Sequence, residues 1–348
     1  MRYIVTGAYG HLGRAVVNHL ADMGKTVWGL VLPGEQDPGH SPATIVEGDV
    51  RNPASLEELF IGLGTGEATV IHTAGIVTVA SKFQQRVQDV NVTGTENIIS
   101  LCERHRVKRL VHVSSVHAIP EKRNGEPVTE TDHFDPRDVI GLYAKTKSEA
   151  TARVLEARAR GLDAVVVHPS GIVGPGDYGR GHLTQLVVDY CNGKLTACVR
   201  GGYDFVDVRD VAAGIVAAAQ AQAPRPCYIL SNQFYEVSQF LEMLHEITGR
   251  KRVKTVLPMW FAALTAPLSE VYYRLLRQPP LYTAYSLYTL RGNAHFSHEL
   301  ASRELGYAPR PLEETLLDSV QFLRSIGRIK SAPAPRRRHG TRPARNPS

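Results

Sequence analysis

The chain has 348 residues, of which 43% are hydrophobic and 21% are charged, and this balance excludes an intrinsically disordered protein. Its formal net charge is +6, but residues 331–348 hold five arginines and no acidic residue, which leaves +1 for residues 1–330. A nearly neutral body argues against nucleic-acid binding by the folded part, because phosphate contacts require a basic surface. We predict that the proline-rich, basic tail 331–348 is disordered.

Short runs of β-branched residues alternate with amphipathic stretches through the first 230 residues. This pattern predicts strands at 3–5, 26–30, 44–46, 69–72, 109–114, 164–168 and 228–230. It predicts helices at 13–23, 55–63, 91–105, 143–160 and 182–191. Strands separated by helices form parallel βαβ units with right-handed crossovers. The expected fold class is therefore α/β, with a doubly wound parallel sheet and a smaller, mainly C-terminal substrate lobe.

The glycine spacing after the first strand predicts a phosphate-binding turn. Residues 6–13 read TGAYGHLG, which places Gly7, Gly10 and Gly13 at i, i+3 and i+6 between a strand and a helix. Such glycines permit a tight turn and a close approach of pyrophosphate to the backbone, and the helix N-terminus offers free N–H groups. The motif predicts a Rossmann dinucleotide-binding core, with the cofactor at Gly7, Tyr9, Gly10, His11 and Leu12.

The choice between NAD and NADP depends on the end of the second strand, where an acid favours NAD and an arginine favours NADP. Residues 30–34 (LVLPG) offer neither. Glu35 is a later acid, and Arg14 on the first helix is a candidate phosphate partner. Because no arginine stands at the strand end, we predict NAD, with NADP as the alternative.

A serine pair and a helical tyrosine–lysine pair indicate acid–base chemistry. Ser114 and Ser115 end the fifth predicted strand, and Tyr143 and Lys147 lie at i and i+4 of a predicted helix. A cation one turn away favours phenolate, so we expect a lowered phenol pKa and a tyrosine able to exchange a proton near neutral pH. The candidate catalytic residues are Tyr143, Lys147 and one serine of the pair Ser114 and Ser115.

The order of these motifs resembles the extended short-chain dehydrogenases/reductases of the NAD-dependent epimerase/dehydratase superfamily. The resemblance covers about residues 1–325 and includes HTAG at 72–75, NVTGTENII at 91–99, HPSGIVGPGD at 168–177 and FVDVRDV at 205–211. It implies that Ser115, and not Ser114, is the catalytic serine beside Tyr143 and Lys147. It further implies a homodimer, and it gives Lys147 a second role at the nicotinamide ribose. It also implies cofactor contacts from the adenine end to the nicotinamide end by Asp49, Val50, Thr73, Ala74, Gly75, Pro169, Ser170 and Gly171.

Three functions remain open within this superfamily. The first is an NAD(P)-dependent oxidoreductase that transfers hydride between nicotinamide and a secondary alcohol or ketone, as in the 3β-hydroxysteroid dehydrogenase and dihydroflavonol reductase-like branch. The second is a nucleotide-sugar epimerase with tightly held NAD, and the third is a non-catalytic NAD(P)-sensing protein. Sugar dehydratases carry an acid pair directly after the catalytic serine, where this chain has Val116 and His117; His117 is instead a further candidate for substrate contact.

Two features bear on the choice of substrate. The segment 258–290 is rich in aromatic residues and favours a hydrophobic, sterol- or flavonoid-like substrate. A nucleotide diphosphate would instead need cations, for which the candidates are Arg180, Arg200, Arg274 and Arg277.

The remaining expectations concern boundaries and location. Residues 1–173 with the return segment 203–231 should form the Rossmann core, and residues 174–202 and 232–330 the substrate lobe. The four cysteines lack CxxC spacing, so we expect no metal site. A strand at the N-terminus without a signal-peptide pattern indicates a cytoplasmic protein. The charge-free run 255–269 is too short to span a bilayer, although peripheral membrane contact through 255–273 or the basic tail is an alternative.

Overall fold

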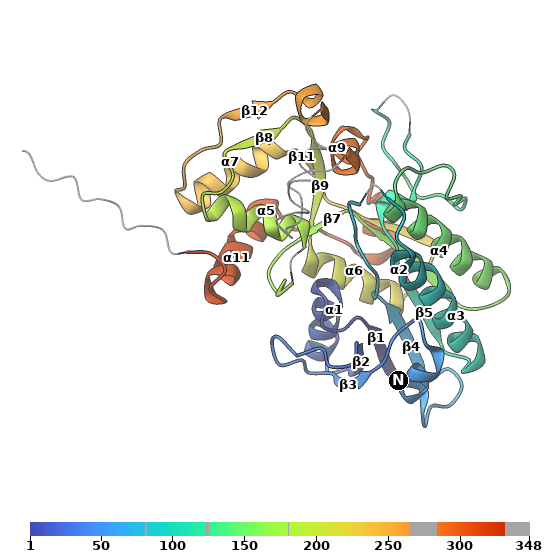
Figure 1. Cartoon of the computed structure of the whole chain (residues 1–348). Helices are drawn as coiled ribbons and strands as arrows, with labels where there is room; N and C mark the ends of the chain where they lie inside the picture. The colour runs from blue at the N-terminus through green and yellow to red at the C-terminus, as the bar shows by residue number, and fades with distance from the viewer. Residues whose placement is uncertain (81, 123–124, 180, 265–283, 331–348) are drawn as a thin grey trace, which may run out of the picture.

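A parallel sheet of seven strands forms the centre of the molecule (Figure 1). The computed structural model describes residues 1–330 except 81, 123–124, 180 and 265–283. The strand order is β10-β6-β5-β4-β1-β2-β3, so the chain winds outward from β1 in both directions. This arrangement confirms the predicted doubly wound sheet. The strands are β1 Arg2–Thr6, β2 Thr26–Val31, β3 Thr44–Glu47, β4 Ala68–His72, β5 Arg109–Val113, β6 Ala164–Pro169 and β10 Cys227–Leu230.

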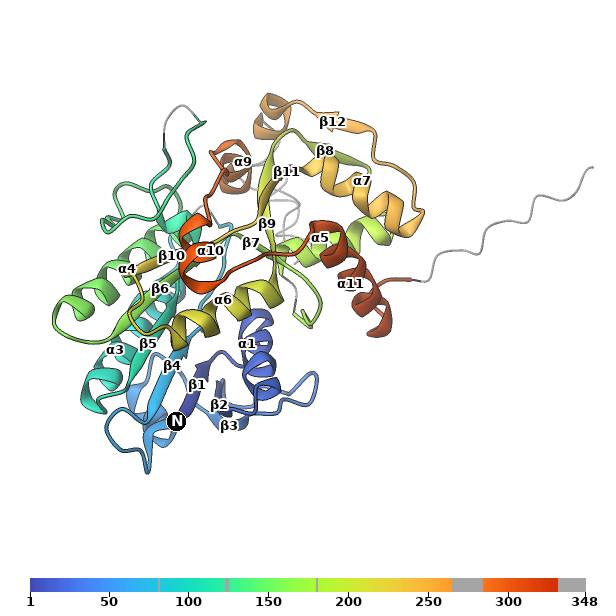
Figure 2. The same ribbon diagram turned by 180° about the vertical axis from the view of Figure 1, so that it is seen from behind.

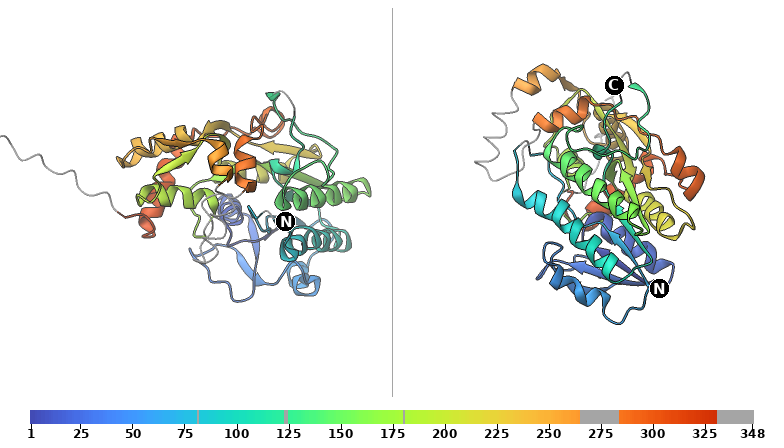
Figure 3. Two further views of the ribbon diagram at one scale, coloured as in Figure 1. Left: turned by 45° about the horizontal axis from the view of Figure 1, so that its top comes forward. Right: turned by 90° about the vertical axis from the view of Figure 1, so that its right-hand side faces the viewer.

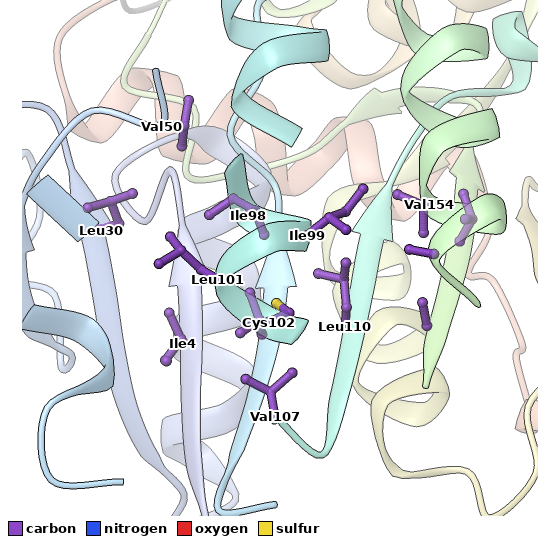
Figure 4. Packing of buried hydrophobic residues seen from close by; sticks show 14 of the residues in the cluster. Ile4, Leu30, Val50, Ile98, Ile99, Leu101, Cys102, Val107, Leu110 and Val154 are labelled. Atoms are coloured by element: carbon purple, nitrogen blue, oxygen red, sulfur yellow. The ribbon is translucent and has the colours of Figure 1, made fainter. Parts of the chain in front are cut away.

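Helices cover both faces of the sheet because its buried strands present apolar side chains alternately to each side. On one face, α3 (Gly94–Arg104) and α4 (Leu142–Ala159) pack Ile98, Leu101 and Val154 against Ile4 and Leu110 (Figure 4). On the other face, α1 (His11–Asp22) and α6 (Val208–Gln220) lie side by side and cover the alternate strand residues (Figure 2). The two faces therefore form two separate cores.

Two predicted helices differ in type from the expectation. The predicted helix 55–63 is a 3-10 helix, η1 (Pro53–Phe60), which buries Leu56, Leu59 and Phe60. Apolar spacing of three and four residues fits either helix type, so the pattern alone does not separate them. The helix predicted from residue 91 is preceded by α2 (Gln85–Gln88) and a π-helical turn (Asp89–Thr93) before α3 begins.

A second group of elements lies beyond the carboxyl ends of the sheet strands. In both views of Figure 3 its orange segments lie toward the top, and the blue strands of the central sheet lie toward the bottom. It contains a three-stranded sheet of β7 (Gly171–Val173), β9 (Gly202–Asp207) and β11 (Gln233–Glu236) and a strand pair of β8 (Ala197–Val199) and β12 (Thr255–Leu257). These elements have their own core, in which Phe205, Phe240 and Leu316 are fully buried. The helices of this region are α5 His182–Cys191, α7 Val237–Thr248, α9 Ala284–Arg291 and α11 Leu312–Ser325, whereas α10 Glu299–Leu305 packs against β10 and α6 of the central sheet.

The segment considered for membrane contact is described only in part. Trp260 and Leu264 are each 69% exposed, whereas residues 265–273 and the basic tail 331–348 lie outside the described residues. No helix in the described part of the chain combines the length and the apolar character needed to cross a membrane.

Candidate active site

A cavity of about 660 Å³ opens at the carboxyl ends of β1, β4, β5 and β6. Ligands bind at this edge in doubly wound folds, where the loops after the strands meet. The structure brings twelve of the predicted site residues to its walls, namely Gly7, Gly10, His11, Leu12, Thr73, Gly75, Ser115, Tyr143, Lys147, Pro169, Ser170 and Gly171. Four others do not line it, namely Tyr9, Asp49, Val50 and Ala74.

The glycine turn forms a cradle with no room for side chains. Gly7 has a φ of 69° and accepts a hydrogen bond from the Gly10 N–H at 3.0 Å. A Cβ on Gly13 would lie 2.1 Å from the Gly7 carbonyl oxygen, so only glycine lets α1 start this close to the turn. The first N–H groups of α1 therefore border the cavity, and the shape and the free donors fit the pyrophosphate of a dinucleotide.

Buried polar contacts fix the strand ends beside this cradle. Thr73 donates from Oγ1 to the Thr6 carbonyl at 2.5 Å, and the Ala74 N–H donates to Thr6 Oγ1 at 3.1 Å. His72 Nδ1 lies 2.8 Å from the same hydroxyl, and burial lowers the His72 pKa to about 3. His72 is thus a neutral strand-end residue that orders the cofactor side of the site.

Ser115 and Tyr143 meet at the opposite wall of the cavity. Ser115 follows β5, and its hydroxyl accepts a hydrogen bond from the His117 N–H at 3.3 Å. Tyr143 stands in the first turn of α4 and is 9% exposed. Burial raises the Tyr143 pKa to about 12, although the neighbouring Ser115 hydroxyl acts to lower it.

The helical spacing of Lys147 predicted a lowered phenol pKa, whereas the pKa of Tyr143 is raised above its usual value. Lys147 Nζ donates to the Val113 carbonyl oxygen at 2.9 Å, and burial lowers the Lys147 pKa to about 8. The ammonium is directed at the end of β5, so in the protein alone desolvation of Tyr143 outweighs the charge one turn away. The expectation of a lowered Tyr143 pKa is therefore wrong for the protein without ligands.

Asn91 joins the loop that follows β4 to helix α4. Its Nδ2 donates to the Ile76 carbonyl at 3.0 Å and to Thr146 Oγ1 at 3.1 Å, while its Oδ1 accepts from the Ile76 N–H at 2.8 Å. A Cβ on Gly75 would meet both Asn91 Oδ1 and Lys147 Nζ at 3.3 Å. Asn91 therefore positions the loop beside Lys147 and does not cap its own helix.

The sequence analysis missed a buried acid beside Ser170. Ser170 donates from Oγ to Asp204 Oδ1 at 2.5 Å, and the same oxygen accepts from the Asn232 N–H at 2.9 Å. Burial raises the Asp204 pKa to about 6. Asp204 directly precedes the FVDVRDV motif at 205–211. A charged residue next to the apolar residues of a predicted buried segment was the available signal for this buried acid.

The adenosine end shows an ion pair instead of a free acid or arginine. Arg14 Nη2 donates to Asp37 Oδ1 at 2.9 Å, and Asp37 also accepts from the Gly39 and Ser41 N–H groups. Burial alone would raise the Asp37 pKa, but these hydrogen bonds hold it at about 2. Glu35 instead accepts from the Leu32 N–H at 3.1 Å. Arg14 is thus engaged within the loop that follows β2.

The substrate side of the cavity has apolar walls and few cations. Lys147 is the one lysine or arginine among the described lining residues, whereas four acids line the same space. Arg200 is exposed and lies outside the lining, and Arg180, Arg274 and Arg277 fall outside the described residues. Of the predicted aromatic wall, Tyr285 and Tyr288 line the cavity. Apolar residues around them are Val77, Val116, Ile119, Val128, Val139, Ile140, Leu183, Ala294 and Phe296.

Comparison with known proteins shows which family and which relatives the chain is similar to. Residues 3–229 match the NAD dependent epimerase/dehydratase family. Sterol demethylase protein B of Methylococcus capsulatus is 30% identical over 339 residues, which cover 94% of this chain and all of that protein. A ketoreductase of Stigmatella aurantiaca, named for a 4-hydroxy-2-methyl-3-oxo-4-farnesyl-3,4-dihydroquinoline-1-oxide, is 30% identical over 336 residues, or 92% of this chain and 96% of that protein. The crystal structure of gox2253 has a TM-score of 0.81 and 29% identity, and covers 94% of this chain and 99% of its own.

Proposed function

The chain belongs to the NAD dependent epimerase/dehydratase family and is an NAD-dependent enzyme of the extended short-chain dehydrogenase/reductase type, and on this basis we propose an oxidoreductase acting on a hydrophobic secondary alcohol or ketone. The observation that carries the proposal is the setting of Ser115, Tyr143 and Lys147 in a cavity whose substrate side is apolar. Apolar walls stabilise a bound substrate by removing apolar surface from water. Similarity to proteins named for a sterol and for a farnesylated ketone supports the same substrate class.

The proposed chemistry divides between three side chains. A bound nicotinamide cofactor would supply the hydride as NADH or accept it as NAD⁺. Tyr143 Oη exchanges the proton of the substrate oxygen, and Ser115 Oγ holds that oxygen in place. Lys147 is protonated at neutral pH, because its pKa is about 8, and its charge favours the phenolate that forms when Tyr143 gives up its proton.

The cofactor-binding residues are part of the proposal. The glycine cradle with His11 and Leu12 would hold the pyrophosphate through backbone N–H groups. Thr73, Gly75 and the segment 169–171 line the way to the nicotinamide end, where Lys147 would also hold the ribose. Asp49, Val50, Tyr9 and Ala74 stand outside the cavity lining, and we propose the first two for the adenine end because they follow β3.

Charge weighs against the nucleotide-sugar alternative. A sugar diphosphate carries two negative charges beyond those of the cofactor and needs cationic partners. The described substrate side offers Glu121 and Asp138 but no lysine or arginine other than Lys147. A neutral, apolar substrate needs no cationic partner and is not repelled by these acidic side chains.

The experiment that tests the proposal follows the absorbance of reduced cofactor. The purified protein is supplied with NAD or NADH and with a panel of 3β-hydroxysterols, aryl ketones and nucleotide sugars. We expect net turnover of cofactor with hydrophobic alcohols or ketones. Epimerisation of a nucleotide sugar, without net change in the cofactor, would contradict the proposal.

We further propose a cytoplasmic homodimer, and peripheral membrane contact through 255–273 or the basic tail as its alternative location. The resemblance to the superfamily supports the dimer, and the exposure of Trp260 and Leu264 supports membrane contact. Light scattering on the purified protein checks the dimer, where the mass of one chain would contradict it. Sedimentation with anionic vesicles checks membrane contact, where protein left in the supernatant would contradict it.

A further inference from the structure

His117 presents an unused polar group to the substrate cavity. It belongs to the short 3-10 turn Val116–Ala118 that follows Ser115, and its side chain is partly exposed and lines the cavity. The backbone N–H of His117 donates to Ser115 Oγ. Within the described residues, neither ring nitrogen has a hydrogen-bond partner.

Most other polar groups on the same side of the cavity already have partners. Tyr288 donates to Glu121 at 3.0 Å, and Tyr203 pairs with Thr289 Oγ1 at 2.9 Å. Asp138 lies 3.5 Å from a histidine outside the cavity. Tyr285 Oη also has no hydrogen-bond partner among the described residues, but it is buried, whereas the His117 side chain is partly exposed. Apart from the reacting pair Ser115 and Tyr143, the His117 imidazole is therefore better placed than Tyr285 to meet a polar atom of the substrate.

The imidazole lies close to the reacting oxygen. The ring centroids of His117 and Tyr143 are 6.4 Å apart and the rings meet edge to face. Burial lowers the His117 pKa to about 4, so the ring is neutral at pH 7 and offers one donor and one acceptor. The His117 imidazole is thus a neutral hydrogen-bonding group close to the place where Ser115 and Tyr143 would hold a substrate oxygen.

We propose that His117 determines substrate specificity by hydrogen-bonding a second oxygen of the substrate, on the carbon next to the reacting carbon or on the one after it. This inference rests on the proposed function and names its substrate class as an oxygenated hydrophobic ketone or alcohol. A substrate without that oxygen removes water from the imidazole and leaves it unpaired, and such a loss costs affinity. Sites built to hydrogen-bond a substrate hydroxyl discriminate against the analogue that lacks it.

The test compares two probes that differ by one hydroxyl. Benzoin is a ketone between two phenyl groups with a hydroxyl on the adjacent carbon, and deoxybenzoin is the same ketone without the hydroxyl. Calorimetric titration of the NADH-bound protein measures the two dissociation constants, and absorbance of NADH measures the two values of kcat/KM. We expect the wild type to bind benzoin about tenfold more tightly than deoxybenzoin.

Two variants separate hydrogen bonding from packing. His117→Leu replaces the imidazole by an apolar side chain of moderate size, so it removes the hydrogen-bonding group and retains packing. It should bring the ratio of the two dissociation constants close to one. His117→Gln retains a donor and an acceptor and should restore most of the preference for benzoin. Far-ultraviolet circular dichroism and NADH affinity check that both variants are folded.

The possible results are distinguishable from failure of the proposed function. Equal binding of the two probes by the wild type, no binding of either, or a preference that persists in His117→Leu would each overturn the inference. Selective binding of benzoin without any turnover would support the role of His117 and contradict the proposed oxidoreductase activity on such ketones.

Discussion

Lys147 donates a hydrogen bond from Nζ to the carbonyl oxygen of Val113 at 2.9 Å, which joins the catalytic helix α4 to the end of β5. The contact holds an ammonium group in a buried place where its charged form is disfavoured, and the Lys147 pKa falls to about 8. A lysine with this pKa is mostly charged at pH 7 and mostly neutral at pH 9. The positive charge of Lys147 in the cavity therefore changes mainly between pH 7 and pH 9.

We predict that affinity for NAD falls as the pH rises through about 8. The protonated amine attracts the anionic dinucleotide, and this attraction is lost when the amine gives up its proton. The cavity histidines His11, His117 and His182 have pKa values lowered by burial, so they stay neutral throughout this window. Titration of NAD between pH 7 and pH 10 checks the prediction. Lys147→Met should bind NAD weakly with a flat pH profile, and a flat profile in the wild type would refute the assignment.

Tyr143→Phe should reduce turnover by roughly 10²–10⁴-fold, the usual contribution of a positioned acid or base. The substitution removes the hydroxyl beside Ser115 and retains the buried ring, so the cavity keeps its shape. Steady-state rates and NAD titration measure the two effects separately. NAD affinity should change little, and near-normal turnover in this variant would exclude Tyr143 as the proton-exchanging group.

Gly13→Ala should abolish NAD binding, because the new Cβ would lie 2.1 Å from the Gly7 carbonyl oxygen and push α1 away from the turn. Gly24→Ala is a matched control at the other end of the same helix. Gly24 has a φ of 67° and no atom near a new Cβ, so this change should cost about 1–2 kcal/mol of stability through the backbone alone. Thermal unfolding and NAD titration of both variants test the contrast. If Gly24→Ala lost NAD binding equally, general instability would explain both results.

Gly141→Ala should disrupt the wall beside Tyr143. Gly141 has a φ of 98°, and a Cβ there would lie 2.0 Å from Tyr285 Cε2. The change therefore combines backbone strain of about 1–3 kcal/mol with a steric clash against a ring from α9. Tyr285→Ala in the same chain should relieve the clash and leave the strain. Melting temperatures of the two single variants and the double variant measure this coupling, and additive effects would show that the Tyr285 ring does not pack against residue 141.

Local patterns made the sheet and the glycine cradle predictable. Each strand of the central sheet is a short β-branched run, and the cradle depends on residues 6–13 and their immediate contacts. Periodicity and spacing within about ten residues carried these predictions, and the spacing of Tyr143 and Lys147 on one helix is of the same kind. Ser115 was selected over Ser114 by the resemblance to the superfamily, and the structure brings it to one cavity with Tyr143 and Lys147.

Contacts between distant segments were beyond such patterns. Asp204 pairs with Ser170 across 34 residues, and Tyr285 meets Gly141 from a helix much further along the chain. The error in the Tyr143 pKa has the same origin, because spacing along a helix gives the distance to a charge but not the burial of the phenol. Desolvation depends on the whole fold, and here it is the larger effect.

The ion pair of Arg14 and Asp37 leads to a prediction about the choice between NAD and NADP. Arg14 is buried, its Nη2 donates to Asp37, and it lies between the rings of Tyr9 and Tyr178. Asp37 thus occupies the guanidinium that could otherwise pair with the 2′-phosphate of NADP, and its own charge repels that phosphate.

Asp37→Asn should therefore shift the preference toward NADP. Because a hydrogen bond to a charged group contributes about 1.5–3 kcal/mol, the ratio of kcat/KM for NADP over NAD should rise roughly tenfold to a hundredfold. Glu35→Gln is the matched control, since it removes the same charge from the same loop, and the Glu35 carboxylate accepts from the Leu32 N–H instead of pairing with Arg14. An equal shift in both variants would mean that loop charge alone sets the preference. No shift in Asp37→Asn would mean that Arg14 does not reach the phosphate.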